Sequence, residues 1–281
     1  MKMRRRGAIA AGLCAIAGLA CWRAPLRGID FGPERDPFRN AGHIEPEEIA
    51  SRPVYRLLLI GDAGSPTSDD PTLALVGEWG NADPAHTAAI YLGDNVYPNG
   101  LQGGRARAHG EAVLLQQIDA TSARKLFVPG NHDWGATPFQ RLARGVLRNE
   151  QDFIEARASA GVRFDPHDGC PGPVAVQLLR PTPALSGGLT VILLDLDWWL
   201  LPERARPVCE GIRSTDDFIA RLRAELGQRR SENVVVVAHH PIRSGGEHGG
   251  YTRGFWTDLG VSIYYRFYTA QDLVEPTITR W

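Results

Sequence analysis

Four short segments of the sequence place polar side chains directly after an apolar run. These segments are GDAG (61–64), GDNVY (93–97), GNHD (130–133) and AHHP (238–241). Short apolar runs of this kind are typical of buried strands, and ligands gather at the carboxyl ends of strands in α/β sheets. The side chains that follow the runs therefore predict one shared site. Its candidate members are Asp62, Asp94, Tyr97, Asn131, His132 and His239.

These side chains offer two carboxylates, a phenol, an amide oxygen and imidazoles. Such mixed oxygen and nitrogen donors suit iron, manganese or zinc rather than a thiolate site. Because its strand lies between the other two in sequence, Asp94 is expected to bridge two ions about 3.5 to 4 Å apart, as in phosphoryl-transfer enzymes. His132 offers a proton donor. Asp133 is expected to lie behind the ligands and to fix the imidazole tautomer, while Gly130 is expected to let the chain turn where its strand ends.

The elements that must position these segments alternate between strands and helices. Strands are expected at 55–60, 88–92, 126–128, 174–179, 189–194 and 233–237. Helices are expected from Asp70 to about 79, over 111–121, from Thr137-Pro138 to about 160, and from Thr215 to about 230. The alternation indicates an α/β fold. The β-branched run at 233–237 predicts a buried strand.

Composition narrows the class of protein. The chain has 281 residues, 43% hydrophobic and 22% charged, which fits one large globular domain or at most two small ones. Residues 1–20 carry four basic residues and no acid, so the remainder holds 27 basic against 32 acidic residues. This acidic balance argues against a nucleic-acid-binding surface.

The first 21 residues are expected to be a signal or lipoprotein leader. A basic start is followed by a small apolar run and then by Gly18-Leu19-Ala20 before Cys21. Cleavage would export the protein, which would then be periplasmic, secreted or anchored through a lipidated Cys21. An uncleaved anchor is the alternative. Residues 22–52 are expected to be an extended lead-in, and residues 53–281 the folded domain.

Export also bears on the cysteines. Cys170 and Cys209 both lie in loops rich in proline and glycine. Because an oxidising compartment permits disulfides, we predict that they pair. The alternative is two unrelated loop cysteines.

The four motifs together resemble the calcineurin-like metallophosphoesterases, and more narrowly the purple acid phosphatases of the tartrate-resistant type. General members of the family carry Asp-x-His in the first motif and an Asp late in the second, whereas this chain has Gly64 and Tyr97. The resemblance covers roughly residues 55 to 250. It implies a four-layer α/β/β/α fold, in which two packed mixed β-sheets are flanked by helices.

The resemblance also implies a site and a reaction. It implies two metal ions, an Fe(III) and a divalent ion (Fe, Zn or Mn), and hydrolysis of a small phosphorylated monoester by a metal-bound hydroxide, as in acid phosphatases. The implied ligands are Asp62 and Tyr97 on the ferric ion, Asp94 as the bridge, and Asn131 and His239 on the divalent ion. His132 and His248 are implied to face the substrate, and His240 to lie behind the ligands.

One departure from the family leaves alternatives open. The family completes its site with a Gly-His-x-His segment, but no histidine follows His248 here. The resemblance therefore implies a C-terminally incomplete domain in which each ion lacks one protein ligand. The chain is an impaired phosphomonoesterase, a non-catalytic remnant that binds metal or phosphate, or a phosphodiesterase or nucleotide phosphatase on the same centre. No specific protein partner is predicted. Asp195 and Asp197 are acids at the end of a strand; we expect them in a solvated loop, and support of the site is the alternative.

Overall fold

The structure is a computed structural model that describes residues 53–135, 143–201 and 206–241. These residues lie in one compact unit of the chain. The expected leader and lead-in, His248 and the segment 137–140 lie outside the described residues.

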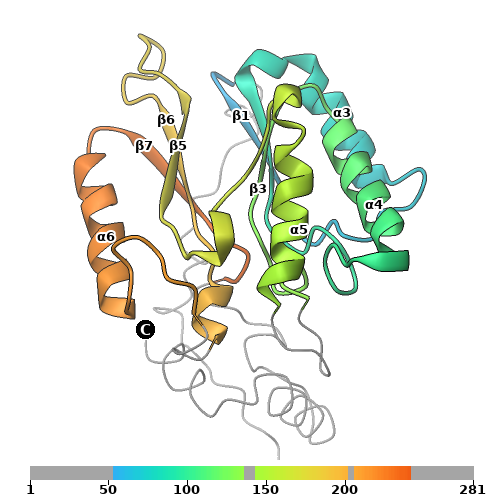
Figure 1. Ribbon diagram of the computed structural model, residues 1–281. Helices are drawn as coiled ribbons and strands as arrows, with labels where there is room; N and C mark the ends of the chain where they lie inside the picture. Colours follow the sequence, from blue (N-terminus) through green and yellow to red (C-terminus); the bar gives the residue numbers. More distant parts are fainter. Residues whose placement is uncertain (1–52, 136–142, 202–205, 242–281) are drawn as a thin grey trace, which may run out of the picture. The chain divides into compact units, whose positions relative to one another are not determined.

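The first sheet is parallel and places three of the motifs at one edge (Figure 1). Its strands are, in spatial order, β1 (Arg56–Ile60), β2 (Thr87–Tyr91), β3 (Arg124–Phe127) and β4 (Val162–Phe164). The register pairs Ile60 with Tyr91 and Tyr91 with Phe127, so β1, β2 and β3 end level with one another. The loops that follow them therefore leave the sheet side by side.

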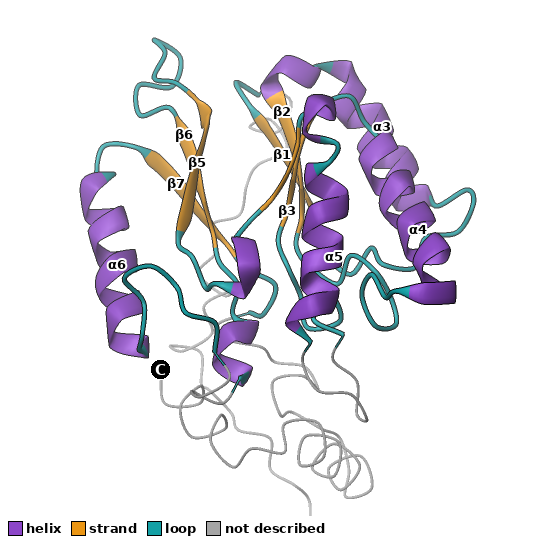
Figure 2. Cartoon of the chain, viewed as in Figure 1, coloured by secondary structure: helices purple, strands orange, loops and turns teal. Residues whose placement is uncertain are grey.

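Three helices cover the outer face of this sheet: α3 (Pro71–Ala82), α4 (Arg107–Asp119) and α5 (Arg144–Glu155) (Figure 2). The start of α3 is the one predicted, because the Asp70 carboxylate accepts hydrogen bonds from the backbone N–H groups of Thr72 (2.9 Å) and Leu73 (3.1 Å). The apolar layer between sheet and helices includes Leu58, Ile60, Tyr91, Phe127, Phe164, Val76, Leu114, Ile118, Leu147 and Ile154.

The second sheet is mixed and contains β5 (Val174–Leu179), β6 (Leu189–Leu193) and β7 (Asn233–Val237). β6 pairs antiparallel with β5 and parallel with β7. Helix α6 (Thr215–Gln228) covers its outer face, with Phe218 buried there. Leu226, near the end of this helix, is 39% exposed.

The inner faces of the two sheets share one apolar layer. It is formed by Ile90, Leu126 and Val128 of the first sheet and Val176, Val191, Leu193 and Val237 of the second. The order of layers is therefore helices, sheet, sheet, helix. This confirms the predicted α/β fold with two packed sheets, although the first sheet is parallel rather than mixed in its described strands.

Two predicted elements differ from the structure, and one strand was not predicted. The helix expected from Thr137-Pro138 to about 160 does not run through Ala143, whose backbone is extended, and it ends at Glu155. Strand β4 was not predicted, because its three residues carry no clear pattern. The expected burial of β7 is wrong: Val237 is buried but Val236 is 45% exposed, because β7 lies at the edge of its sheet among the described strands.

Cys170 and Cys209 form a disulfide, which confirms the predicted pairing. It joins the loop before β5 to the segment that leads to α6. None of the helices in the described ranges is long and apolar enough to cross a membrane.

Candidate metal centre

Three predicted ligands from two different sheets converge on one point. Asp62 follows β1, Asp94 follows β2 and His239 follows β7. One ligand atom of each lies within 4.8 Å of the others. His239 Nε2 is 3.5 Å from Asp94 Oδ1. Residues separated by up to 177 positions in sequence thus form a single donor cluster.

The phenol of Tyr97 belongs to the same cluster. Its hydroxyl lies 2.7 Å from Asp62 Oδ1 and 2.9 Å from Asp94 Oδ2. Burial, together with the two carboxylates, raises the pKa of the phenol above its ordinary value. A phenolate at this position therefore needs a cation to offset the burial and the negative charge around it.

Both site carboxylates stand on unusual backbone. Asp62 has φ of 58° and Asp94 has φ of 56°, in the left-handed region that residues with a side chain rarely adopt. Strained backbone of this kind clusters at functional sites. For Asp94 the conformation is held by its own side chain, since Oδ1 accepts a hydrogen bond from the backbone N–H of His132 at 2.9 Å.

Two glycines allow the loops to approach this closely. A Cβ on Gly130 would lie 2.5 Å from both the backbone nitrogen and Oδ1 of Asp94, so close approach, rather than the expected turn, requires glycine here. Gly93 has φ of 96°, and a Cβ on it would lie 2.8 Å from His239 Nδ1. The ends of β2 and β3 therefore touch each other and the imidazole without intervening side chains.

The tautomer of His239 is set by the backbone. Its Nδ1 lies 2.9 Å from the carbonyl oxygen of Leu92, so Nδ1 carries the proton and donates. In the neutral ring, the lone pair is then on Nε2, which faces Asp94. This is the arrangement in which a buried imidazole binds a metal ion.

His132 lies at the rim of the cluster. Its Nδ1 contacts the carbonyl oxygen of Pro98, and its Nε2 is 3.9 Å from Asp94 Oδ2. The ring meets the Tyr97 ring edge-on, with centroids 4.6 Å apart. Asn131 is half-buried in the same loop. His248, the other predicted substrate-facing residue, lies outside the described residues.

Asp133 acts differently from the prediction. It is fully buried, and its carboxylate accepts hydrogen bonds from the backbone N–H groups of Gly130 (2.8 Å), Asn95 (2.8 Å) and Val96 (3.1 Å). The imidazole that it was expected to orient is bound to Pro98 instead. Asp133 therefore ties the loop after β3 to the loop that carries Asp94 and Tyr97.

A second buried acid supports that loop. The side-chain amide of Asn95 donates to Asp133 Oδ2 at 3.0 Å and to Glu150 Oε1, on α5, at 3.1 Å. Burial raises the pKa of Glu150 to about 8, and burial together with Glu150 raises the pKa of Asp133. Sequence reasoning did not identify Glu150, because an acid within an amphipathic helix is indistinguishable from a solvated one.

The acids after β6 are also buried, contrary to the expected solvated loop. Asp195 accepts hydrogen bonds from Trp134 Nε1 (3.0 Å) and from the backbone N–H of Asp197 (2.9 Å). Asp197 is fully buried, and neither of its carboxylate oxygens receives a hydrogen bond from the described residues. Burial raises the pKa of Asp197 to about 7, against the lowering effect of His239. Nδ1 of His240 lies 3.8 Å from Oδ2 of Asp197.

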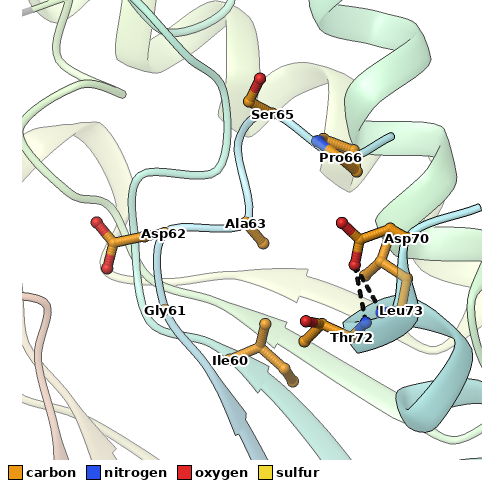
Figure 3. Close-up of a pocket in the computed structure, with 9 residues that line it drawn as sticks. All are labelled: Ile60, Gly61, Asp62, Ala63, Ser65, Pro66, Asp70, Thr72 and Leu73. Carbon is orange, nitrogen blue, oxygen red and sulfur yellow. Dashed lines mark hydrogen bonds between the residues drawn. The ribbon is translucent and has the colours of Figure 1, made fainter. Parts of the chain in front are cut away.

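A pocket of about 100 Å³ lies beside this cluster and has Asp62 in its lining. It is lined by the loop 60–66 and by the start of α3. Figure 3 shows the carboxylate of Asp62 pointing away from Asp70 and Thr72. The Asp70 carboxylate, which also lines the pocket, is already occupied in capping α3.

The residues present fit a metal ion. Two carboxylates, a phenol and an imidazole with a fixed tautomer supply the oxygen and nitrogen donors that transition metals bind. The carboxylate of Asp94 is buried, and its ion-pair partners within the described ranges are His132 and His239. Negative charge concentrated in this way, without a nearby Lys or Arg pair among these residues, is stabilised by a cation.

No protein-family model and no curated protein matches the chain. Among solved structures, the chain is similar to one described as GAP50, the anchor in the inner membrane complex of Plasmodium, at 16% identity and a TM-score of 0.43. That match covers 77% of this chain and 63% of the other. It is also similar to a phosphopantetheinyl hydrolase from Mycobacterium tuberculosis, at 16% identity and a TM-score of 0.38, over 75% of each chain.

Proposed function

We propose that the protein is a metal-dependent phosphoric ester hydrolase, an acid-phosphatase-like phosphomonoesterase with a dinuclear centre. The observation that carries this proposal is the convergence of Asp62, Asp94 and His239 within 4.8 Å at the carboxyl ends of strands from two sheets. The phenol of Tyr97, hydrogen-bonded to both carboxylates, completes a donor set suited to two ions.

The residues divide between the two ions. Asp62 and Tyr97 would hold a ferric ion, Asp94 would bridge, and Asn131 and His239 would hold a divalent ion (Fe, Zn or Mn). When bound, the ions would polarise the phosphoryl oxygens and lower the pKa of a water nucleophile.

The residues of the chain have their own tasks in this reaction. His132 Nδ1 donates to the Pro98 carbonyl oxygen, so when the ring is protonated on both nitrogens Nε2 is the one that can give its proton to the leaving alkoxide, which leaves a neutral imidazole. The side chain is 26% exposed, so substrate can reach it. The backbone N–H of His132 holds the Asp94 carboxylate, and one residue thus supports both the proton transfer and the bridge.

The substrate class and compartment belong to the same proposal. The substrate is a small phosphorylated molecule and not a nucleic acid, given the acidic balance of the chain beyond residue 20. Export to the periplasm or the medium is supported by the basic and apolar start of the sequence and is compatible with the disulfide. Lipidation of Cys21 is one means of membrane attachment.

The test uses the full chain, produced under oxidising conditions and loaded with Fe, Zn or Mn. We expect it to bind metal and to hydrolyse p-nitrophenyl phosphate faster than bis-p-nitrophenyl phosphate. Asp94→Asn should abolish both binding and hydrolysis. Asp69→Asn, which removes an exposed carboxylate before α3, should change neither.

Other outcomes select the alternatives. Tight metal binding without hydrolysis of either ester identifies a non-catalytic binding protein. Faster hydrolysis of the diester identifies a phosphodiesterase. The proposal is refuted if the parent chain binds no metal, or if the Asp94→Asn variant binds metal as well as the parent does.

A further inference from the structure

Asp197 is a buried carboxylate that the metal-binding proposal does not use. It follows β6, its side chain is fully buried, and neither oxygen receives a hydrogen bond from the described residues. Asp195, two residues earlier and equally buried, instead receives hydrogen bonds from Trp134 Nε1 and a backbone N–H. A buried carboxylate without hydrogen bonds destabilises a fold, so its presence at this position calls for a function.

Contacts through two histidines connect Asp197 to the metal centre. Its Oδ2 lies 3.8 Å from Nδ1 of His240. The His240 ring meets the His239 ring edge-on, at 79° with centroids 4.9 Å apart. His239 in turn places Nε2 3.5 Å from Asp94 Oδ1, within the donor cluster. A continuous chain of contacts therefore runs from Asp197 through the two histidines to the metal-binding point.

We infer that Asp197 is a positioning residue of the metal centre, which acts through His240 and His239 to strengthen cation binding; this inference rests on the proposed function. The carboxylate draws the Nδ1 side of the His240 ring toward it, and that ring packs against one side of His239. On its other side His239 is held by the Leu92 carbonyl oxygen at 2.9 Å. The negative charge of Asp197 also lies behind the imidazole that would receive the cation, and it favours the metal-bound form.

This role predicts opposite effects on stability and on metal binding. Replacing Asp197 by Asn keeps the shape and removes the buried charge, so the metal-free protein should become more stable. The same change removes the support behind His239, so cation affinity should fall. A residue with a purely structural role would lower stability and leave the affinity unchanged.

The experiment uses the full chain and Mn²⁺ alone as the probe. Mn²⁺ affinity is measured by calorimetric titration, and the thermal midpoint is measured in a chelator. We expect Asp197→Asn to weaken Mn²⁺ binding about 10- to 100-fold, the range for residues behind metal ligands, and to raise the midpoint in chelator. His240→Phe, which keeps a ring and removes Nδ1, should also weaken binding. The double variant should lose less than the product of the two, because both act along one chain of contacts.

Glu232→Gln provides the matched control. Glu232 accepts a hydrogen bond from Thr190, at the opposite end of β6 from Asp197. The Glu232→Gln variant therefore removes one carboxylate charge beside the same sheet, away from the metal centre. Its Mn²⁺ affinity should equal that of the parent.

Each remaining result overturns the inference. If the parent binds Mn²⁺ and Asp197→Asn binds within twofold of it, the inference fails while the proposed function stands. A lower midpoint for Asp197→Asn in chelator, or failure of that variant to fold, shows that the carboxylate is structural. If the parent binds no Mn²⁺, Fe or Zn, the inference and the proposed function fail together.

Discussion

His239 Nε2 lies 3.5 Å from Asp94 Oδ1, although the two residues follow strands of different sheets. The contact needs glycine at position 93, where a Cβ would lie 2.8 Å from His239 Nδ1. The donor cluster is therefore a property of how the two sheets pack, and both sheets have to be in place before it exists.

Two variants of Asp62 distinguish the effect of its charge on metal binding from the effect of its backbone conformation on stability. Asp62→Asn removes the charge but keeps a side chain that tolerates positive φ, whereas Asp62→Ala removes both. We expect each variant to weaken Mn²⁺ binding by more than about 100-fold, beyond the range for residues behind the ligands. In chelator, only the alanine variant should lose free energy of unfolding, by about 1 kcal/mol. Denaturant unfolding and metal titration of both variants give the comparison, and equal stabilities would contradict the strain at Asp62.

Gly93 should affect both the free energy of unfolding and metal binding. Gly93→Ala adds a Cβ at a φ of 96° and within 2.8 Å of the Gly130 backbone and His239. We expect a loss of about 2 kcal/mol or more in the free energy of unfolding, and weaker Mn²⁺ binding. Gly103→Ala is the control, because no atom lies within 4 Å of its added Cβ and its φ is negative. Its stability should stay within about 0.5 kcal/mol of the parent. A Gly93→Ala protein as stable as the control would show that the loops can separate.

The sequence allowed the donor cluster to be predicted because local signals and one topological rule were enough. Strand ends could be read from apolar runs that stop at glycine, and the Asp70 cap and the disulfide followed from equally local patterns. The rule that side chains after parallel strands meet at one edge accounts for Asp62 and Asp94, whereas His239 joins them through the packing of the second sheet on the first.

The burial of the supporting acids could not be predicted, because it is a property of the assembled layers. Asp197 and Glu150 lie in segments whose sequence is equally compatible with solvent. Glu150 lies among the buried residues of α5, and Asp197 follows Asp195, which accepts a hydrogen bond from the buried Trp134. The exposure of Val236 has the same origin, since the position of a strand within its sheet is not written in its own residues.

Glu150 predicts how stability depends on pH. Its folded-state pKa is about 8 and its ordinary value is 4.5, so between these pH values the folded protein binds a proton that the unfolded chain releases. The free energy of unfolding should therefore fall as the pH rises from about 4.5 to about 8. Glu150→Gln cannot ionise, so its curve should be flatter. At pH 8 the variant should exceed the parent by at least about 1.4 kcal/mol, the equivalent of one pKa unit.

This dependence is measured by denaturant unfolding at pH 5 and pH 8 in chelator. Asp152→Asn, an exposed acid on the same helix, is the control and should follow the parent. Parallel curves for the parent and Glu150→Gln would mean that Glu150 is ionised in the folded protein.

The disulfide should contribute to stability without forming part of the site. It closes a loop of 39 residues, and loss of a crosslink of this size typically lowers the free energy of unfolding by about 2 to 4 kcal/mol. The double variant Cys170→Ser/Cys209→Ser should show this loss in urea unfolding. Its Mn²⁺ affinity, measured well below the transition, should match the parent. A lower affinity would instead connect the crosslinked loops to the ligands.

The apolar layer shared by the two sheets has a second consequence. Leu126 and Val191, on facing strands, set the separation of the sheets, and that separation fixes how far His239 stands from Asp62 and Asp94. The thickness of this apolar layer therefore sets the distances among the donor atoms of the cation site. We expect removal of a methyl group from this layer to change the distances among the donor atoms, although no donor atom is itself replaced.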